Sequence, residues 1–506
     1  MKRLMILLVA LAVAALIPTA GAFAAPAEKV ITIGVDQEAV GLDPHIVTAF
    51  SSHRRLDLLY NRLVRIDDSM AIVPDLAESW DNPNNTTYVF HLRKGVKFHN
   101  GREMTSDDVV FSLNRVLDPK TASPGRSYIA TVTAIEAVDK YTVKLTLSGP
   151  LPSLLDGLSS NNLAIVAKEA VAANGNLQKV EAGTGPFMLK EWVADNSMTL
   201  VRNPDYFEKG APTADKVIFR VIPEQASLLA GVKSGELDMA TINDGAIIRQ
   251  AAKDPKVTVM SKPGLNMRIF SFNTTRKPFD NVLVRQAVSL ALDAPEILTI
   301  AEFGMGKVTG PLPIAATKWA AAPSTLPFTG PDLAQAKSLL AKAGFPNGFT
   351  MKITCSSTYE GGLAVAQVAQ DELKKIGITA ELEVVEWGVY IDKWVKRDFD
   401  TMIELRGGSA EPDRFLYRTF HSTGGVNNFL FKDAAVDGLL DAGRGQTAYA
   451  DRKVTYDKLQ YLLSEKAPAV FLYCPNENQV LSKSLSGFKL VGNGSLYYLT
   501  NTDVKR

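Results

Sequence analysis

The chain has little cysteine and no excess charge of either sign, and each shortage excludes a class of protein. Only Cys355 and Cys474 occur among 506 residues, so no network of disulfides holds this fold together. Both lie in strand-like runs. An exported chain could oxidise them to one disulfide bond, but two buried free thiols are the simpler expectation. The 55 Lys and Arg residues nearly equal the 54 Asp and Glu residues, which leaves no basic excess for nucleic acid.

Long apolar runs are missing after the first residues. The chain begins with the basic pair Lys2-Arg3, an apolar run over Leu4–Ile17 and small residues at Ala22–Ala24. These are the parts of a secretory signal, and the run is shorter than the roughly 20 residues of a membrane span. The small residues at Ala22 and Ala24 predict cleavage after Ala24. Because the first cysteine is Cys355, we expect a periplasmic protein without a lipid anchor. Loss of Lys2 and Arg3 leaves 53 basic residues against 54 acidic ones.

Patterns of common enzymes are incomplete. Gly304–Gly310 is glycine-rich like a phosphate loop, but Ala301 and Val308 stand where that loop needs Gly and Ser or Thr. Ser409 begins like the nucleophile elbow of a hydrolase, but Glu411 stands where the second Gly belongs. We therefore predict no enzymatic activity and no cofactor.

The five histidines form no HExxH pattern and no close pair. His91 and His99 flank a predicted hairpin and could converge on a metal, but separate surface histidines are the commoner arrangement. No resident metal site is predicted.

The residues that are present indicate a large soluble protein. A hydrophobic fraction of 46% with 22% charged residues is that of a folded globular chain. Because 506 residues exceed what one core supports, two or three compact units are expected.

The clearest local signals lie in the stretch 76–115. Turn formers precede Tyr88–Leu92, where buried and exposed positions alternate with the period of a strand. Reversals at Lys94-Gly95 and Asn100-Gly101 then predict a β-hairpin whose second arm is Val96–Phe98. Thr105 can cap a following helix, whose apolar positions are Val109, Val110, Leu113 and Val116.

Strands alternate with helices in two separate series. Each series predicts a parallel sheet covered by helices, and together they predict two α/β lobes joined by crossover segments. The ligand of such a protein is expected between the lobes, beyond the carboxyl ends of the strands. Gly487–Leu499 would return to the first lobe. The first series is Val217–Val221, Glu224–Lys233, Leu237–Ala240, Asp244–Lys253 and Val257–Ser261; the second is Thr350–Cys355, Gly362–Ile376, Thr379–Glu386, Val389–Lys396 and Thr401–Leu405.

Motifs along the whole mature chain resemble those of the family 5 extracellular solute-binding proteins, the peptide, dipeptide and nickel receptors of ABC importers. Beside the stretch 76–115 they are GTGPFMLKEW at Gly183–Trp192, NPDYF at Asn203–Phe207, SGELDM at Ser234–Met239, the segment Phe272–Asp293, and LLAKAGFPNGF at Leu339–Phe349. The resemblance implies a two-lobed periplasmic-binding-protein fold of class II with an extra α+β domain in the first lobe. It would place lobe I at 25–60, 185–270 and 480–506, the inserted domain at 61–184 and lobe II at 271–479.

The resemblance also implies a function. We expect a monomeric periplasmic receptor that captures a peptide or an amino-acid-derived solute and delivers it to an inner-membrane ABC permease and its ATPase. A nickel or metal-chelate receptor of the same family, an exported peptide-holding chaperone and a hydrolase on a two-lobed fold are the alternatives.

Most ligand contacts are implied by position in the family. Thr48 and Phe50 match residues that touch the ligand's main chain, as do Thr241 and Asn243. Trp387 matches a tryptophan that lines the pocket. Tyr128 and Tyr359 are two further candidates.

The anchor for the ligand's ends differs from the family pattern. In peptide-binding relatives an aspartate pairs with the ligand's α-amine, and here its position falls on Gly408 or Ser409, neither of which carries charge. A buried ammonium without a partner is costly, so a peptide with a free α-amine is not expected unless Glu411 or Glu404 serves instead. Arg406 would suit a ligand carboxylate if it faces the cleft. The alternative is an Arg406 tied to a neighbouring acid, namely Glu404, Glu411 or Asp413.

Overall fold

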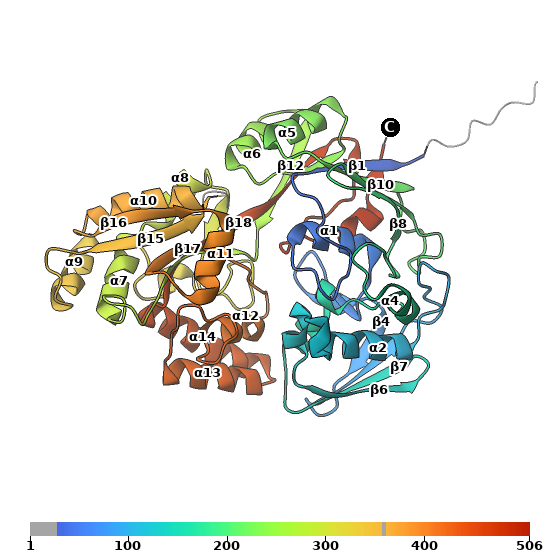
Figure 1. Cartoon of the computed structure of the whole chain (residues 1–506), viewed down its shortest axis with the longest axis horizontal. Helices are drawn as coiled ribbons and strands as arrows, with labels where there is room; N and C mark the ends of the chain where they lie inside the picture. The colour runs from blue at the N-terminus through green and yellow to red at the C-terminus, as the bar shows by residue number, and fades with distance from the viewer. Residues whose placement is uncertain (1–27, 357–360, 506) are drawn as a thin grey trace, which may run out of the picture.

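The computed structural model describes residues 28–356 and 361–505, and 12 of the strands described there form one long mixed sheet that runs through both halves of the molecule (Figure 1). Strand β18, Ala469–Ser482, is shared by the halves: its first part pairs with β13 and its last part with β11 and β12. The order is β16 (Thr379–Val385), β15 (Thr350–Ser356), β17 (Thr401–Arg406), β13 (Met267–Phe272), β18, β11 (Met239–Thr241), β1 (Val30–Val35), β10 (Lys216–Val221), β9 (Ser197–Arg202) and β8 (Phe187–Val193). The predicted two-lobed α/β fold is therefore present.

Lobe II contains the second predicted series. Strand β15 is parallel to β16 and to β17, and α10 (Gly362–Lys374) and α11 (Trp387–Lys396) connect them. The predicted bounds are confirmed within a few residues. Helices that also belong to this lobe are α7 (Val282–Ala291), α8 (Ala294–Ala301), α9 (Leu333–Lys342), α12 (Pro412–Phe420), α13 (Ala434–Gly445) and α14 (Tyr449–Lys466).

Lobe I confirms the first series only in part. Strands β10 and β11 lie on either side of β1 and are parallel to it, with α5 (Gln225–Ser234) as the crossover. The last strand, β12 (Val257–Pro263), follows α6 (Gly245–Ala251) and was expected to be parallel, but it pairs antiparallel with β18. The reason is that β12 leads directly into β13 of lobe II and follows β18 across the molecule.

The inserted domain is a four-stranded antiparallel sheet of β4 (Ala77–Asp81), β5 (Thr87–Leu92), β7 (Thr142–Leu147) and β6 (Val132–Asp139). Helix α2, Ser106–Leu117, begins with the predicted Thr105 cap, in which the Thr105 and Asp108 side chains bond each other's backbone N–H groups. The predicted hairpin partner of β5 is wrong. β5 pairs with β4 and β7, and residues 96–98 make only an isolated bridge from Lys97 to Glu103.

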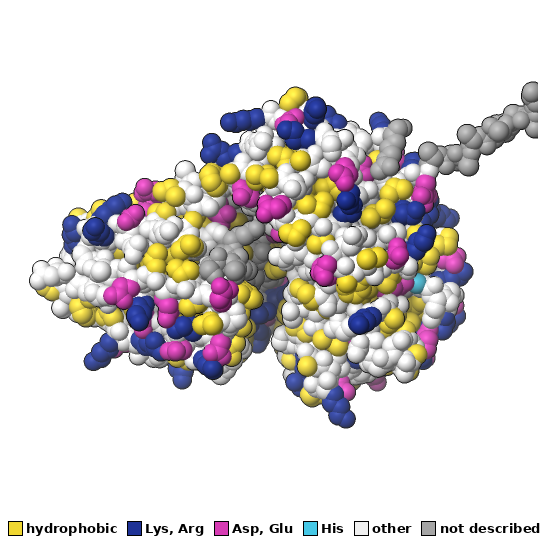
Figure 2. All heavy atoms as spheres, turned by 45° about the horizontal axis from the view of Figure 1, so that its top comes forward, with side chains coloured by type: hydrophobic (Ala, Val, Ile, Leu, Met, Phe, Trp, Pro, Cys, Tyr) yellow, Lys and Arg dark blue, Asp and Glu magenta, His cyan; other side chains and the backbone are white. Residues whose placement is uncertain are grey.

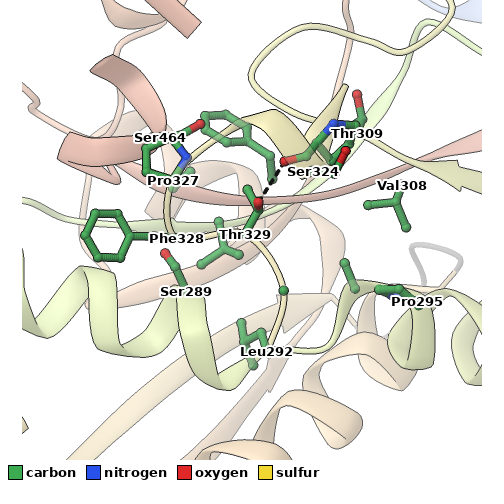
Figure 3. A pocket seen from close by; sticks show the side chains of 16 residues that line it. Ser289, Leu292, Pro295, Val308, Thr309, Ser324, Pro327, Phe328, Thr329 and Ser464 are labelled. Carbon is green, nitrogen blue, oxygen red and sulfur yellow. Dashed lines mark hydrogen bonds between the residues drawn. The ribbon is translucent and has the colours of Figure 1, made fainter. Parts of the chain in front are cut away.

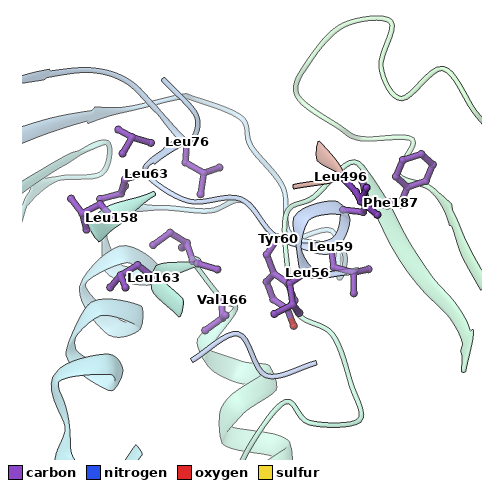
Figure 4. Packing of buried hydrophobic residues seen from close by; sticks show 14 of the residues in the cluster. Leu56, Leu59, Tyr60, Leu63, Leu76, Leu158, Leu163, Val166, Phe187 and Leu496 are labelled. Carbon is purple, nitrogen blue, oxygen red and sulfur yellow. The ribbon is translucent and has the colours of Figure 1, made fainter. Parts of the chain in front are cut away.

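One continuous apolar core joins the inserted domain to lobe I (Figure 4). Helix α1 contributes Leu56 and Leu59, and Phe187 and Leu496 reach the same cluster from β8 and the C-terminal segment. The return of the C-terminal segment to lobe I is confirmed. The sequence pattern over Arg54–Leu63 predicts a helix, but helix α1 covers Phe50–Leu59, four residues earlier. It ends there because the next residues bond to the segment 75–77 instead.

Both cysteines are buried free thiols, as expected. Burial raises the pKa of each thiol to about 11. Within the described ranges, no helix has the length and apolarity to cross a membrane. The predicted signal sequence and its cleavage after Ala24 lie outside the described residues.

Candidate ligand-binding cleft

A deep furrow separates the two lobes on one side of the molecule (Figure 2). Two strand connections bridge it: β18, and the turn at 264–266 between β12 and β13. Where β18 passes between the lobes, Glu477 pairs with Arg54 of α1 at 3.5 Å, and burial raises the pKa of the Glu477 carboxyl. Two short strand connections beside an open furrow are typical of a hinge between two lobes.

The lobes meet across the furrow through six side chains that we call the cross-lobe cluster. Its members are Tyr128, Ser153 and Asp156 from the inserted domain, and Ser409, Asp413 and Arg414 from lobe II.

Asp156 is the centre of this cluster. It sits on the short helix α3, Leu154–Leu158, and accepts from Arg414 at 2.7 Å and from the Ser409 hydroxyl at 3.1 Å. Ser153 donates to Asp413 at 2.8 Å. The Arg414 guanidinium lies 4.1 Å from the ring centre of Tyr128. Contacts of this kind form only when the lobes approach, so they favour a closed arrangement.

Glu411 is already engaged within lobe II. It is the cap of α12 and accepts the backbone N–H of Asp413 at 3.1 Å. Its carboxylate also pairs with Arg452. Burial raises the pKa of Glu411 more than Arg452 lowers it. A ligand ammonium at this acid would have to compete with Arg452.

Arg406 is paired with Glu404, the first of the three neighbouring acids that the sequence offered as its partners. Its guanidinium donates to Glu404 at 2.8 Å, to the Val426 carbonyl at 3.0 Å and to the Asn428 side chain. It also lies 4.7 Å from the ring centre of Phe429. Only 7% of Arg406 is exposed, and most of its donors serve lobe II itself.

Gly408 has no room for a side chain. A β-carbon there would lie 2.2 Å from the Leu265 carbonyl oxygen and 2.5 Å from Pro313 Cγ. The neighbouring Ser409 is buried and donates to Asp156. Neither position offers a carboxylate to a ligand amine.

The first-lobe candidates differ in exposure. Thr48 is exposed, and Phe50, at the start of α1, is 56% exposed. Thr241 is fully buried and donates to the Gln479 side chain at 3.1 Å. Asn243 is partly buried and its N–H donates to Gln225. Thr48 and Phe50 are therefore the more accessible pair.

Among the second-lobe aromatic candidates, Trp387 begins α11, is 42% exposed and stacks on Tyr390 with 5.4 Å between ring centres. Tyr359 lies outside the described residues.

The two candidate histidines do not converge. His91 contacts Asp81 at 2.8 Å, whereas His99 contacts Glu181 at 2.5 Å and the Gly185 carbonyl at 3.0 Å. In residues 28–356 and 361–505 no three His, Cys, Asp or Glu side chains gather as a metal site.

A separate cavity of about 220 Å³ lies inside lobe II (Figure 3). Leu292, Val308 and Phe328 line it beside hydroxyl groups such as that of Ser464. Its volume is below the roughly 300 to 1,000 Å³ of small-molecule pockets, and no member of the cross-lobe cluster lines it. The furrow is the better candidate for the binding site.

Sequence reasoning missed helix α12 and therefore Arg414. The signal was present: Glu411 followed by Pro412 is a cap followed by proline at the first helical position. Asp156 and Ser153 had no comparable signal, because their partners lie more than 250 positions away.

The model of the bacterial extracellular solute-binding proteins, family 5 Middle, matches residues 71–427. The chain is 30% identical over 485 residues to a dipeptide-binding protein of Pseudomonas aeruginosa, covering 89% of this chain and 90% of that one. It is 29% identical over 463 residues to heme-binding protein A of Haemophilus influenzae, covering 85% and 84%. The solved structure of the periplasmic binding protein DppA from Helicobacter pylori, in complex with the peptide STSA, matches with a TM-score of 0.81 at 29% identity. That match covers 94% of this chain and 98% of the other.

Proposed function

The chain belongs to the family 5 bacterial extracellular solute-binding proteins, and from that premise we propose that it binds a peptide or peptide-like solute between its lobes and delivers it to an ABC permease. The family consists of receptors, and we propose that this chain likewise makes and breaks no covalent bond.

The cross-lobe cluster is the observation that carries this proposal. Asp156 of the inserted domain meets Arg414 and Ser409 of lobe II, so groups from both lobes border the furrow. A solute that touches both lobes adds contacts that exist only in the closed form, and it shifts the population toward that form. The permease can then distinguish loaded from empty receptor by shape.

The solute we propose carries no free α-amine. Gly408 has no room for a carboxylate, and Ser409 and Glu411 are held by Asp156 and Arg452. An ammonium placed there would lose water without gaining a free anion, which is unfavourable. N-blocked peptides and other amino-acid derivatives fit this environment better.

The proposed contacts follow exposure. Thr48 and Phe50 would meet the solute from lobe I, and Trp387 from lobe II. Tyr359 lies outside the described residues and stays a candidate on the family pattern alone. Thr241 and Asn243, which bond to Gln479 and Gln225, would support the wall of the cleft behind them.

The remaining proposals concern the location of the protein in the cell and the boundaries of its domains. The chain would be exported, cleaved after Ala24, and act as a periplasmic monomer beside an inner-membrane permease and its ATPase. Lobe I would comprise 25–60, 185–270 and 480–506, with the inserted domain at 61–184 and lobe II at 271–479. Along β18 the partner changes from β13 at Tyr473 to β12 at Asn476, which supports a boundary a few residues before 479.

A thermal-shift screen of the protein from Ala25 to Arg506 tests the proposal. The panel contains free and N-acetylated di- and tripeptides, acidic amino-acid derivatives, and nickel with chelators. At a hundredfold excess over its dissociation constant, a true ligand stabilises the folded protein by roughly 3 kcal/mol. A shift by N-acetylated peptides that exceeds the shift by free peptides supports the proposal. A shift by nickel chelates alone would contradict it.

A further inference from the structure

Helix α12 carries two arginines one turn apart. Residues four apart in a helix lie on one side, so Arg418 leaves α12 on the same side as Arg414. Arg414 reaches across the furrow to Asp156 at 2.7 Å and covers the ring of Tyr128. Arg418 therefore borders the cleft next to the inserted domain, and it is exposed.

Arg418 differs from its basic neighbours in having no acidic partner. Four nearby arginines are paired: Arg414 with Asp156 at 2.7 Å, Arg444 with Asp413 at 2.9 Å, Arg406 with Glu404 at 2.8 Å, and Arg452 with Glu411. Throughout the described ranges 28–356 and 361–505, no carboxylate lies within the 4.0 Å of an ion pair from the Arg418 guanidinium. Among these five arginines, Arg418 is the one whose positive charge has no carboxylate partner in the described ranges.

The pKa shifts of Arg418 and Tyr128 agree with an uncompensated positive charge on Arg418. Although Arg418 as a whole residue is exposed, desolvation of its charged end by the surrounding side chains lowers its pKa. Repulsion by Arg414 and Arg406 lowers it further, against the opposing effect of Tyr128. Burial raises the pKa of the Tyr128 hydroxyl, but Arg414 and Arg418 outweigh it, so this pKa lies below its usual range. Like charges held close together repel, and an anion placed among them relieves the repulsion.

Resting on the proposed function, we propose that Arg418 and the Tyr128 hydroxyl bind a carboxylate of the solute. The guanidinium offers two parallel N–H donors to the two carboxylate oxygens, and Tyr128 offers a third donor from the opposite lobe. A carboxylate at this position touches both lobes and so favours closure. Arg406 has a weaker claim to this role, because most of its donors are taken by Glu404, Val426 and Asn428.

The first test uses one peptide in two forms. N-acetyl-Ala-Ala-Ala and its C-terminal amide differ only in the carboxylate, and calorimetry measures their affinities for the wild type, Arg418→Gln and Arg418→Lys. The matched control is Arg249→Gln on α6, an exposed helix arginine that also has no ion pair in the described ranges. We expect the acid to bind the wild type about 10- to 100-fold more tightly than the amide. The preference should vanish in Arg418→Gln, persist partly in Arg418→Lys and be unchanged in the control.

Two results would overturn the carboxylate site while leaving the receptor function intact. One is equal affinity of the wild type for acid and amide. The other is a preference that survives in Arg418→Gln.

A second measurement separates failure of this site from failure of the proposed function. If neither peptide binds the wild type, the peptide-like solute is wrong, and the site is judged with sulfate as the anion. Melting temperatures are compared in sodium sulfate and sodium chloride at equal ionic strength, because sulfate stabilises proteins in general by exclusion from their surface. We expect a saturating extra shift in the wild type and in Arg249→Gln that is lost in Arg418→Gln. Equal shifts in all three proteins would overturn the site.

Discussion

We predict that Glu372 in lobe II makes the stability of the protein depend on pH. It is only 2% exposed on α10, and its Oε2 accepts the backbone N–H of Asp293 at 3.0 Å. Its Oε1 is buried and has no hydrogen-bond partner among the described residues. Burial raises the pKa of this carboxyl to about 7, and the charges of Glu296 and Asp293 add to the rise.

The sign of the effect follows from proton binding. An unfolded chain has this pKa at 4.5, so between 4.5 and 7 the folded protein holds the proton more tightly. The stabilisation is fully present below about pH 4.5 and is lost as pH rises through 7. A gap of 2.5 between the two pKa values corresponds to about 3 kcal/mol of unfolding free energy.

Glu372→Gln tests this reasoning because the amide stays neutral and keeps an oxygen for the Asp293 N–H. At pH 8 the variant should be more stable than the wild type by up to about 3 kcal/mol, and at pH 5 by less than about 1 kcal/mol. Urea unfolding followed by circular dichroism measures both. Asp371→Asn, on the exposed side of the same helix, is the control and should show no such pH dependence. A stability gain that is equal at pH 5 and pH 8, or absent at both, would refute the argument.

Two further predictions concern the cleft. Gly408→Ala should lower the unfolding free energy by about 1 to 3 kcal/mol because its β-carbon meets the Leu265 carbonyl. Gly407→Ala, whose β-carbon has no neighbour nearer than 3.9 Å, should change it by less than about 0.5 kcal/mol in the same urea titration; equal costs would contradict the contact. Asp156→Asn should weaken solute binding at least about tenfold in calorimetry, because the closed form loses the ion pair with Arg414. The melting temperature of the ligand-free variant should fall as well, because the structure already contains the pair of the buried Asp156 with Arg414. Unaltered affinity would count against the role of Asp156.

Elements with a strong local pattern could be predicted from the sequence. The alternating residues Val30–Val35 predict a first strand, and β1 has these bounds. The pattern of residues 449–466 predicts a helix near these positions, and α14 covers Tyr449–Lys466. Thr105 caps α2 as predicted. The sequence also offers Asp280 or Asn281 and Asp332 as helix starts, and Asn281 caps α7 and Asp332 caps α9. These signals depend only on neighbouring residues, so a single sequence contains them.

The length of β18 could not be predicted. The apolar run stops at Cys474, and Pro475 with the polar residues after it is typical of a loop. The strand continues because partners far away in the sequence pair with this part: Gly306 of β14 (Gly306–Val308) lies opposite Pro475, and Pro263 of β12 lies opposite Asn476. Such pairing is decided by tertiary structure rather than by local propensity.

The candidate site shows the same limit. The family pattern directed attention to Arg406, Gly408 and Ser409, and Ser409 does face the other lobe. Asp413 and Arg414 face it too, but the pattern did not propose them as cleft residues. Which side chain of a segment reaches across a cleft depends on the placement of the whole lobe, and no local pattern records that placement.

Small-angle X-ray scattering of the protein from Ala25 to Arg506, with and without a solute that raises its melting temperature, tests the central claim most directly. Closure of the furrow around the solute should reduce the radius of gyration at saturation, with a midpoint at the calorimetric dissociation constant. Unchanged scattering in the presence of a solute that binds and stabilises the protein would contradict the account of a receptor that closes on its ligand.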